Sequence, residues 1–490
     1  MSLVDSPAVD LERLISTLAP AEVLHGAPVE ILDLAYDTRS VTPGATFFCA
    51  RGEHVDRHDL AGRAVEAGAA ALVVERPLDL DVPQLVVADA RAAMARAAVE
   101  FFGHPSRELT VVGVTGTNGK TTTTFLLFSI LAAAGRRPGL LGTVEVRIGG
   151  ERRPAVRTTP EAIDLQRTLR EMLDAGDRSC VLEATSHGTH FRRLDGTRFA
   201  ALVFTNLSQD HLDLHGTMER YFDAKRRLFV DGDPAPVAVN VGDPYGRRLA
   251  DELRALDRAP LLTFALDREA DVTPQSLELT PRGARMAVDG IELDTPLLGR
   301  FNVENVLGAV AAARLLGLPA ESVVRGVASV RGVPGRFEPV DEGQSFLVVV
   351  DYSHTPDSLE NALRTARSLA GGRVICVFGC GGDRDRGKRP AMGRVASSGS
   401  DVTIVTSDNP RSEDPEAIIR DVLEGVTGEV EVEPDRALAI AQAVAAARSG
   451  DVVLIAGKGH EQGQESRGAT VPFDDRAVAR EALRKLGART

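Results

Sequence analysis

Nine consecutive residues, 115–123, read Thr-Gly-Thr-Asn-Gly-Lys-Thr-Thr-Thr and combine two glycines with a lysine and several hydroxyls. Glycines let backbone N–H groups turn toward phosphate oxygens, a lysine adds positive charge at the terminal phosphates, and the adjacent hydroxyl ligates Mg²⁺. The segment therefore predicts a loop that binds ATP. Its expected contact residues are Gly116, Thr117, Asn118, Gly119, Lys120, Thr121 and Thr122.

The sequence on either side of this loop has the elements that would position it. An apolar strand is expected at 109–114, and an apolar helical stripe runs from Phe125 and is closed by Gly135. The common pattern has glycine where Val114 stands, so the loop is a variant. The alternative is a glycine-rich turn with a solvated lysine. The order strand, loop, Lys-Thr and helix favours ATP binding.

The composition limits the class of protein. A chain of 490 residues is too long for one core and predicts about three domains. A formal charge of −13 argues against a general nucleic-acid binder. We expect a cytoplasmic protein without a membrane span, because the first residues lack a signal-peptide pattern and no apolar run is long enough. Four cysteines without metal-site spacing are expected to be reduced thiols.

The order of apolar and amphipathic segments along the sequence predicts the fold class. Short apolar runs alternate with amphipathic, Ala-rich segments, which is typical of α/β units with largely parallel sheets. We predict domains at 1–102, 103–335 and 336–490, with a linker at 101–106. Strands are expected at 31–36, 46–50, 71–74, 85–87, 109–114, 181–183, 200–204, 237–240, 347–350, 374–378, 402–406 and 452–456, and a helix at 61–67. Ligands should gather at the carboxyl ends of these strands.

The phosphate loop resembles that of the Mur ligases and their folylpolyglutamate synthetase relatives. Further family motifs follow in order at 183–187, 204–213, 221–229, 301–305, 335–338, 351–356, 378–384 and 457–461. The resemblance covers nearly the whole chain. It implies an N-terminal UDP-binding α/β domain, a central ATPase-type parallel sheet and a C-terminal Rossmann-like domain.

The resemblance also implies a metal site. Thr121, Glu183 and His211 would bind Mg²⁺, and Lys225 would carry a carbamate that binds a second ion. ATP and a substrate carboxylate repel each other, so divalent charge is needed to bring them together. The catalytic set would be Lys120, Lys225 and His211. The alternatives are strand-end hydrogen bonds for Glu183 and His211 and an ordinary surface lysine at Lys225.

Four residues are expected to hold the rest of the nucleotide. By resemblance, Asn302 and Asn305 would bind the adenine edge, and Asp351 would bind the ribose with Arg336 nearby. Helix capping is the alternative for the two asparagines.

The first block and the start of the second would bind a UDP-sugar peptide. The resemblance places Thr38, Glu53, His54 and Val55 at the UDP end, and Thr158, Thr159, Thr185 and Arg193 at the muramoyl-peptide end. A helix N-cap before 161–169 is the alternative for Thr158 and Thr159. Two residues depart from the family. Arg57 stands where a glycine is usual, and Phe191 stands where some relatives have a polar Gln, whose contact should be absent.

By resemblance, the third block carries an amino-acid selector, Asp408-Asn409-Pro410-Arg411, which is the motif of the diaminopimelate-adding members of the family. Meso-diaminopimelate differs from lysine by a second amino-acid end, whose carboxylate a guanidinium can bind bidentately. The residues expected to complete this site are Arg384, Gly457 and Glu461. The alternative is an Asn-Pro turn with a solvated arginine.

Together these features predict an ATP-dependent ligase. By resemblance, it would add meso-diaminopimelate to UDP-N-acetylmuramoyl-L-alanyl-D-glutamate through an acyl phosphate, acting as a monomer. The rivals are a lysine-adding, D-Ala-D-Ala-adding or folylpolyglutamate ligase, a P-loop ATPase without ligase activity, and a noncatalytic UDP-sugar binder.

Overall fold

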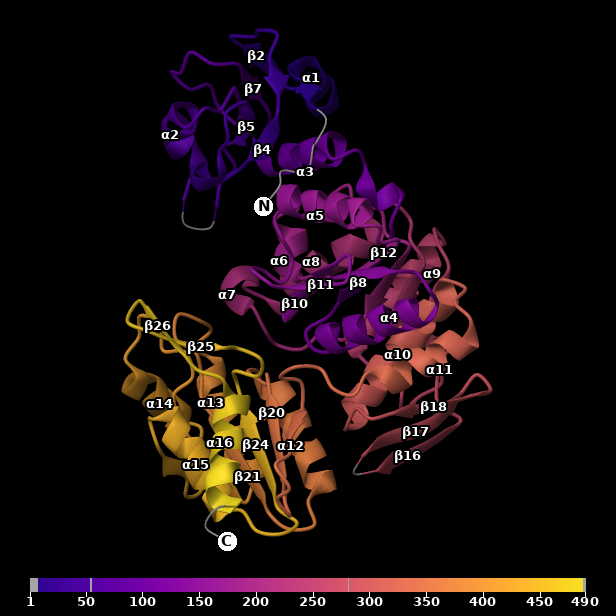
Figure 1. Cartoon of the computed structure of the whole chain (residues 1–490), viewed down its shortest axis with the longest axis vertical. Helices are drawn as coiled ribbons and strands as arrows, with labels where there is room; N and C mark the ends of the chain where they lie inside the picture. Colours follow the sequence, from indigo (N-terminus) through magenta and orange to yellow (C-terminus); the bar gives the residue numbers. More distant parts are fainter. Residues whose placement is uncertain (1–7, 53–54, 281, 488–490) are drawn as a thin grey trace.

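A computed structural model describes residues 8–52, 55–280 and 282–487. Figure 1 shows three bodies that follow one another along the chain. The indigo first block lies at the top, the magenta second block lies in the middle, and the orange-to-yellow third block lies at the lower left.

The first block is built on a five-stranded sheet of order β2-β7-β6-β5-β4, in which only β2 is antiparallel to its neighbour. The strands are β2 (Glu22–Leu24), β4 (Asp33–Ala35), β5 (Ala45–Phe48), β6 (Ala71–Val74) and β7 (Gln84–Val86). Its helices are α1 (Leu11–Leu18), α2 (Ala61–Glu66) and α3 (Ala90–Phe101). A further pair joins β1 (Val9–Asp10) to β3 (Glu30–Ile31).

The second block contains an eight-stranded sheet of order β11-β10-β9-β12-β8-β13-β14-β15, parallel except at β10 and β11. The strands are β8 (Thr110–Thr115), β9 (Pro138–Leu141), β10 (Glu145–Ile148), β11 (Glu151–Pro154), β12 (Ser179–Glu183), β13 (Ala201–Phe204), β14 (Val237–Asn240) and β15 (Leu261–Phe264). The helices are α4 (Lys120–Ala133), α5 (Ala162–Asp174), α6 (Ser186–His190), α7 (Leu212–His215), α8 (Met218–Val230), α9 (Pro244–Leu256), α10 (Arg300–Leu315) and α11 (Ala320–Ser329).

The third block has a six-stranded sheet of order β19-β20-β24-β21-β22-β23, in which β19 alone runs antiparallel to its neighbour. The strands are β19 (Glu338–Val340), β20 (Leu347–Asp351), β21 (Val374–Phe378), β22 (Val402–Val405), β23 (Glu431–Val432) and β24 (Val452–Ala456). The helices are α12 (Pro356–Leu369), α13 (Lys388–Gly399), α14 (Pro415–Leu423), α15 (Arg436–Ala446) and α16 (Asp475–Gly487). A hairpin joins β25 (Gly463–Ser466) to β26 (Ala469–Pro472).

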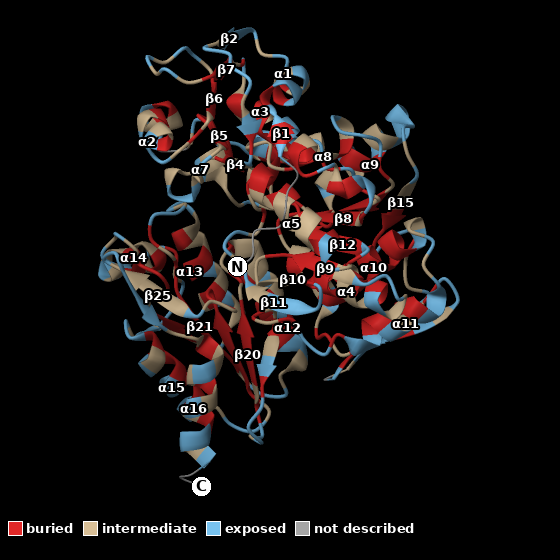
Figure 2. Ribbon diagram, turned by 45° about the horizontal axis from the view of Figure 1, so that its top comes forward, coloured by how far each residue is buried: buried red, intermediate tan, exposed pale blue. Residues whose placement is uncertain are grey.

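The apolar strands form parallel sheets because both of their faces are covered. Every residue of β12, β21 and β24 is buried, and Figure 2 shows the central strands in red. Side chains alternate between two cores: Val111 lies in one, and Val112 and Val114 lie in the other, on the opposite face of the sheet. This two-sided burial explains the unbroken Val, Leu and Ile runs in the sequence.

The expected α/β fold is confirmed, and the predicted strands lie within two residues of observed ones. Two features were not predicted from the sequence. One is an antiparallel sheet of β16 (Ser276–Thr280), β17 (Gly283–Val288) and β18 (Ile291–Thr295), and the other is the β25–β26 hairpin. The four cysteines are buried free thiols. Within the described ranges, no helix has the length and apolar character that crossing a bilayer requires.

Candidate functional site

The phosphate loop joins β8 to the start of α4, as the sequence predicts. Two of its residues must be glycine. Gly116 and Gly119 have positive φ values of 154° and 83°. A Cβ would lie 1.8 Å from Oγ1 of Thr205 at the first position and 2.3 Å from Oδ1 of Asn305 at the second. The loop therefore brings its backbone against neighbouring elements more closely than any side chain would allow.

The ammonium of Lys120 lies inside the curve of this loop. Its Nζ donates to the carbonyl oxygens of Gly116 at 3.0 Å and Thr117 at 2.8 Å. Burial lowers the pKa of Lys120, while the carboxylates of Glu183 and Asp210 oppose that shift. Lys120 thus brings a positive charge to the loop, which is the charge that the terminal phosphates of a nucleotide require.

Lys225 is an interior lysine, not a surface one. It extends from α8, its exposed fraction is 1%, and its Nζ donates to the carbonyl of Gly116 at 2.8 Å. The ring of Tyr221 lies 4.9 Å from the same nitrogen. Burial, and then the positive charge of Lys120, hold the pKa of Lys225 well below its ordinary value. The two lysines therefore share one carbonyl of the phosphate loop.

Glu183 ends β12 beside the loop and is almost fully buried. Thr143 donates to both of its carboxylate oxygens, from the backbone N–H at 2.8 Å and from the hydroxyl at 3.0 Å. Each oxygen retains a further lone pair, so the carboxylate is held in place and can still bind a cation.

The predicted peptide-binding hydroxyls gather around Glu183. Thr159 donates from Oγ1 to the carbonyl of Glu183 at 2.7 Å and lies 2.9 Å from Oγ1 of Thr185. Thr158 lies 3.1 Å from the hydroxyl of Thr143. Arg193 donates to the carbonyl of Thr159 at 3.0 Å. The N-cap alternative is wrong for the threonines, because Glu161 caps α5 and does so without a side-chain hydrogen bond.

His211 precedes α7 in a left-handed backbone conformation, with φ 53°. Its Nε2 lies 3.3 Å from Oδ2 of Asp210, and its ring packs edge-on against His187 at 4.7 Å between centroids. Burial lowers the pKa of His211 to about 4. The imidazole is therefore neutral near pH 7, which is the form that ligates metals.

The predicted nucleotide residues lie around the same loop. Asn302 donates to the carbonyl of Leu298 at 2.8 Å, and Asn305 donates to Oδ1 of Asn302 at 3.0 Å. Neither amide caps α10, whose N-cap is Gly299. Arg336 donates to the hydroxyl of Thr121 at 3.0 Å.

Asp351 ends β20 and holds the turn that follows it. Its carboxylate accepts from the backbone N–H of Phe337 at 2.7 Å and from that of Ser353 at 2.8 Å. A residue that the sequence analysis missed, Asp357, connects the third block to the phosphate loop. It accepts from Nδ2 of Asn118 at 2.9 Å and from Oγ of Ser208 at 3.0 Å.

The predicted selector forms a second cluster, in the third block. Asn409 donates to Glu461 at 2.7 Å, and Arg411 donates to the carbonyl of Gly382 at 2.5 Å. A Cβ at Gly457 would lie 2.5 Å from Oδ2 of Asp408. Pro410 is buried with Asp408 and Asn409, whereas Arg384 is exposed. The backbone N–H of Glu413 donates to the carbonyl of Pro410 at 3.1 Å, so a turn begins at the proline. Arg411 within this turn is anchored and not solvated, with 24% of its side chain exposed.

Lys458 organises this second cluster and was not singled out from the sequence. It is fully buried, and its Nζ donates to Oδ1 of Asn409 at 2.8 Å and to Oε2 of Glu461 at 3.1 Å. The motif at 457–461 contains this lysine, but the sequence does not reveal that it is buried against the asparagine.

The predicted uracil end of the site is less enclosed. Thr38 begins a short 3-10 helix (Thr38–Ser40), and Val55 is half exposed. Glu53 and His54 lie outside the described residues. Arg57, the departure from the family glycine, donates to the carbonyl of Ala50 at 3.1 Å and lies 5.5 Å from the Tyr36 ring centroid. It therefore closes its own loop against the sheet.

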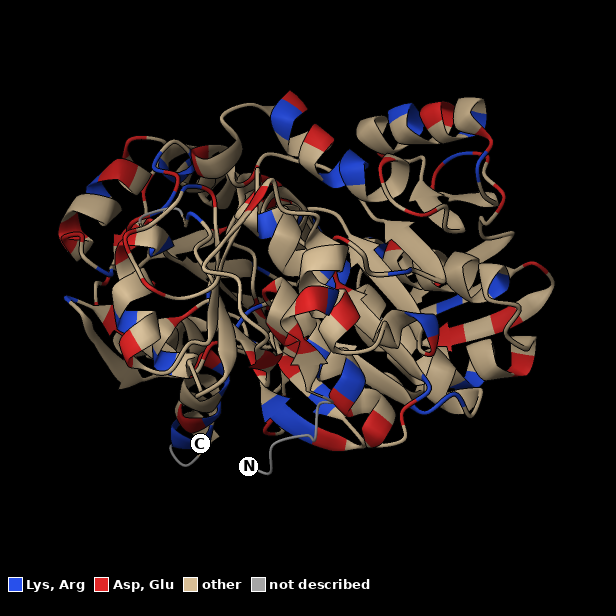
Figure 3. Ribbon diagram, turned by 90° about the horizontal axis from the view of Figure 1, so that it is seen from above, with Lys and Arg blue, Asp and Glu red and all other residues tan. Residues whose placement is uncertain are grey.

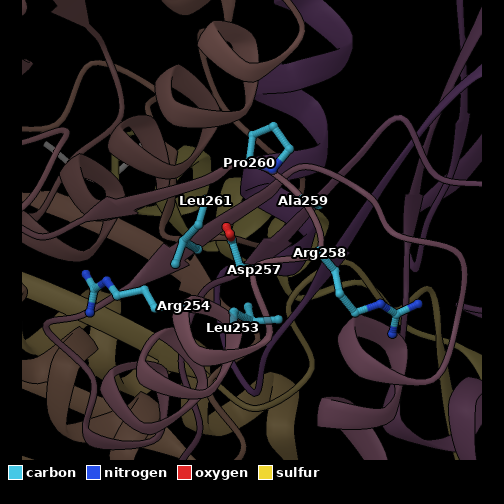
Figure 4. A pocket seen from close by; sticks show the side chains of 7 residues that line it. All are labelled: Leu253, Arg254, Asp257, Arg258, Ala259, Pro260 and Leu261. Atoms are coloured by element: carbon cyan, nitrogen blue, oxygen red, sulfur yellow. The ribbon is translucent and has the colours of Figure 1, made fainter.

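A separate cavity of about 460 Å³ lies where α9 leads into β15, at the amino end of that strand. In Figure 4 the guanidiniums of Arg254 and Arg258 point away from each other. Arg258 already donates to the carbonyls of Val230 and Gly232, and Arg254 to the carboxylate of Asp251. The phosphate loop follows the carboxyl end of β8, which runs in the same direction as β15 in this sheet. The cavity, at the amino end of β15, therefore lies on the side of the sheet opposite to the phosphate loop.

In comparisons with known proteins, domain models of one family match each of the three blocks. The "Mur ligase family, catalytic domain" matches residues 30–109, the "Mur ligase middle domain" matches residues 114–313, and the "Mur ligase, glutamate ligase domain" matches residues 335–459. Relatives called UDP-N-acetylmuramoyl-L-alanyl-D-glutamate--2,6-diaminopimelate ligase are similar over nearly their full length. The one from Geobacillus thermodenitrificans is 46% identical and covers 97% of this chain and 99% of its own. The one from Streptomyces coelicolor is 43% identical, covering 98% and 97%.

Solved structures are similar over the same span. A structure of a UDP-N-acetylmuramoyl-L-alanyl-D-glutamate--2,6-diaminopimelate ligase has a TM-score of 0.69 at 32% identity and covers 98% of this chain and 99% of its own. MurF from Acinetobacter baumannii has a TM-score of 0.67 at 20% identity and covers 99% and 100%. At that identity, the second likeness concerns the fold alone.

Proposed function

Because the chain belongs to the Mur ligase family, we propose that it joins meso-diaminopimelate to UDP-N-acetylmuramoyl-L-alanyl-D-glutamate, an ATP-dependent step in peptidoglycan synthesis. One observation carries the proposal from the geometry. The hydroxyl of Thr159, at the predicted peptide end, donates directly to Glu183, beside the phosphate loop. A carboxylate held at these threonines would therefore lie next to the bound triphosphate.

The reaction would run in two steps. The substrate carboxylate attacks the terminal phosphorus of ATP, which gives an acyl phosphate and ADP. The amine then attacks the acyl carbon, and the tetrahedral intermediate expels phosphate and loses a proton to give the amide. Lys120 holds the phosphoryl oxygens while the loop N–H groups orient them, so the protein contributes mainly positioning and charge.

The residues at the loop fit Mg²⁺ through their oxygens. The hydroxyl of Thr121 and the carboxylate of Glu183 are the hard ligands that this ion prefers, and His211 offers a neutral imidazole. When bound, Mg²⁺ would supply the charge that lets a triphosphate and a carboxylate approach each other. Among the residues described, no group of three or more His, Cys, Asp or Glu side chains forms a metal cluster.

We propose that Lys225 carries a carbamate. Formation of a carbamate requires a neutral amine, whose lone pair attacks CO₂ and which then releases a proton. The lowered pKa of the buried Lys225 supports that requirement. The product would be an anion beside Lys120, able to bind a second Mg²⁺.

The remaining assignments are also proposals. Residues 1–102 would bind the UDP end, residues 103–335 would carry out the ligation, and residues 336–490 would bind the incoming amino acid. Asn302 and Asn305 would bind adenine, and Asp351 would bind the ribose, with Arg336 beside them. We propose that the enzyme acts in the cytoplasm, since it consumes ATP, and that it acts as a monomer.

Acceptor choice would depend on the third block. Arg411 would bind the distal carboxylate of diaminopimelate, and Asp408 and Glu461 would bind its ammonium groups. The residues that would shape the rest of this pocket are Arg384, Asn409, Pro410 and Gly457. The observation that supports this amino-acid pocket is the buried Lys458, which donates to both Asn409 and Glu461 and holds them in place.

A phosphate-release assay with UDP-N-acetylmuramoyl-L-alanyl-D-glutamate tests the function. We expect turnover with meso-diaminopimelate and little with L-lysine or D-Ala-D-Ala. The Arg411→Ala variant should raise the KM for diaminopimelate about tenfold or more with the KM for ATP unchanged. The exposed Arg420 on α14 provides the control variant Arg420→Ala. A preference for lysine would overturn the acceptor, and phosphate release without any acceptor would indicate a plain ATPase.

A further inference from the structure

Three arginines converge on one buried carboxylate between the first and second blocks. Glu161, 3% exposed, accepts from Arg157 at 2.8 Å, and its carboxylate lies 2.9 Å from Arg193 and 3.4 Å from Arg91. One negative charge faces three positive ones, so the cluster has a surplus of cations. Burial lowers the pKa of both Arg91 and Arg193. The charge of Glu161 opposes that shift, and neighbouring arginines add to it.

Phe191 holds two of these arginines. The guanidinium carbon of Arg91 lies 4.6 Å from the ring centroid, and that of Arg193 lies 5.4 Å from it. The face of an aromatic ring attracts guanidiniums without neutralising their charge. Phe191 therefore gathers the two cations, and it does so at the position where the sequence departs from the family's polar residue.

The guanidiniums have unused hydrogen-bonding capacity. Nε of Arg193 is buried and has no hydrogen-bond partner among the described residues. A buried N–H that is left unsatisfied costs about 1–3 kcal/mol, so such a group indicates a missing acceptor. The acceptor that suits a pair of guanidiniums is an anion with two oxygens.

The cluster lies on the path between the two ends of the substrate site. Arg193 donates to the carbonyl of Thr159, and the hydroxyl of Thr159 donates to the carbonyl of Glu183 beside the phosphate loop. Arg91 donates from Nε to the carbonyl of Arg51 at 2.9 Å, in the first block. The pair is therefore close to the reacting end and also reaches the UDP end.

We infer that Arg91 is a further substrate-binding residue, which shares with Arg193 the carboxylate of the dipeptide that does not react, while Phe191 positions both arginines. The inference rests on the proposed function. UDP-N-acetylmuramoyl-L-alanyl-D-glutamate carries two carboxylates, and only one is activated by ATP. The other stays charged throughout and needs cations that are not shared with the triphosphate. Glu161 keeps the arginines together until that carboxylate arrives.

Calorimetric titration of the Arg91→Ala variant with this substrate tests the inference without turnover. We expect Kd to rise about 10- to 100-fold, from the loss of charge-assisted hydrogen bonds, with ATP binding unchanged. Arg91→Lys should recover only part of the affinity, because an ammonium cannot form the bidentate pair. Arg96→Ala, on the exposed side of the same helix, is the control. An unchanged Kd in a folded Arg91→Ala variant would overturn the inference.

A substrate analogue distinguishes a carboxylate from a phosphate. The analogue is the same compound with its non-reacting carboxylate amidated. We expect amidation to weaken binding to the wild type at least as much as the Arg91→Ala substitution does. Amidation should weaken binding to the variant by a smaller factor, because the variant retains Arg193 but has lost Arg91. If Arg91→Ala weakens the binding of UDP alone by the same factor, the anion is the diphosphate and the carboxylate assignment is wrong. Failure of the wild type to bind the natural substrate at all would instead contradict the proposed function.

The positioning role of Phe191 needs its own variant. Phe191→Leu removes the ring and keeps an apolar side chain, and it should raise the Kd for the natural substrate severalfold but leave that for the amidated analogue unchanged. Phe191→Tyr keeps the ring face and should bind both as the wild type does. A purely structural role would lower the Tm of Phe191→Leu without this selectivity, which would contradict the positioning role.

Discussion

Two buried carboxylates in this protein, Asp475 and Glu161, differ in how they are balanced by arginines. Arg436 and Asp475 in the third block are both fully buried and form two parallel hydrogen bonds of 2.7 Å. The remaining nitrogen of Arg436 donates to the carbonyl of Ser407, so each nitrogen of the guanidinium has an acceptor. Around Glu161, by contrast, three arginines share one carboxylate and one N–H has no partner.

The difference separates a structural arginine from one that is available to a ligand. Figure 3 shows positive and negative residues interspersed over the whole ribbon. Neither arginine group can therefore be recognised from the overall distribution of charge. A saturated pair holds α15 and α16 to the sheet, whereas an unsaturated group still needs an anion.

The Asp475→Ala variant should lose about 3–5 kcal/mol of unfolding free energy, because it leaves the Arg436 charge buried without a partner. Urea unfolding measures the loss. Asp474→Ala, at the neighbouring and partly exposed carboxylate, is the control and should lose under about 1 kcal/mol. Similar losses in the two variants would show that the buried Arg436–Asp475 pair stabilises the fold no more than a partly exposed carboxylate does.

The Glu161→Gln variant should lose about 2–3 kcal/mol, since three arginines then repel one another without a counter-ion. Unlike the stability lost in Asp475→Ala, the stability lost in Glu161→Gln should be recovered when a ligand binds. We expect UDP-N-acetylmuramoyl-L-alanyl-D-glutamate to raise its Tm by more than it raises that of the wild type. The shift is measured by differential scanning fluorimetry. An equal or smaller shift would contradict the claim that the arginines around Glu161 are available to an anionic ligand.

Glu413 tests a third arrangement, in which Arg389 donates to both Glu413 and Asp421. The hydrogen bond from Arg389 lowers the pKa of Glu413 from 4.5 to about 2. Its stabilisation should therefore be complete above pH 4.5 and should disappear as the pH falls toward 2. Glu413→Gln should cost about 1–2 kcal/mol at pH 7 and almost nothing near pH 2. A pH-independent difference in urea midpoints would contradict this linkage.

Exposed pairs should show the smallest effect. Glu360 and Arg364 lie one turn apart on α12, 3.0 Å from each other, with more than half of each side chain exposed. The Arg364→Ala variant should change the unfolding free energy by only about 0.3–0.5 kcal/mol, because solvent screens the pair. A loss near that of Asp475→Ala would mean that burial does not explain the contrast.

The sequence predicted the parts of the fold that local patterns determine. β12, β21 and β24 were found because parallel strands buried on both faces are unbroken apolar runs. The sheet of β16, β17 and β18 was missed because most residues of its edge strand β16 are exposed and give no such run. The buried residues of the other two strands, Met286, Val288 and Leu293, alternate with more exposed ones, so these strands are not unbroken apolar runs either.

The site shows the same division. The phosphate loop and Glu183 belong to local motifs, so their proximity follows from strand order. The cluster at Glu161 joins residues 70 positions apart in sequence, and the contact of Asp357 with Asn118 spans 239 positions. Such contacts depend on how the blocks pack, which residue spacing does not record. For the same reason, Lys458 could be seen in its motif but not placed against Asn409.

One feature of the first block bears on how the chain folds during synthesis. Its hydrophobic core contains α1 and α3 together with Ala162 and Ile163 at the start of α5. A nascent chain that ends at residue 102 thus lacks part of the apolar surface that closes this core. The ribosome must deliver some sixty further residues before the first block can complete its packing, and until then its exposed face is a site for chaperones or misassociation.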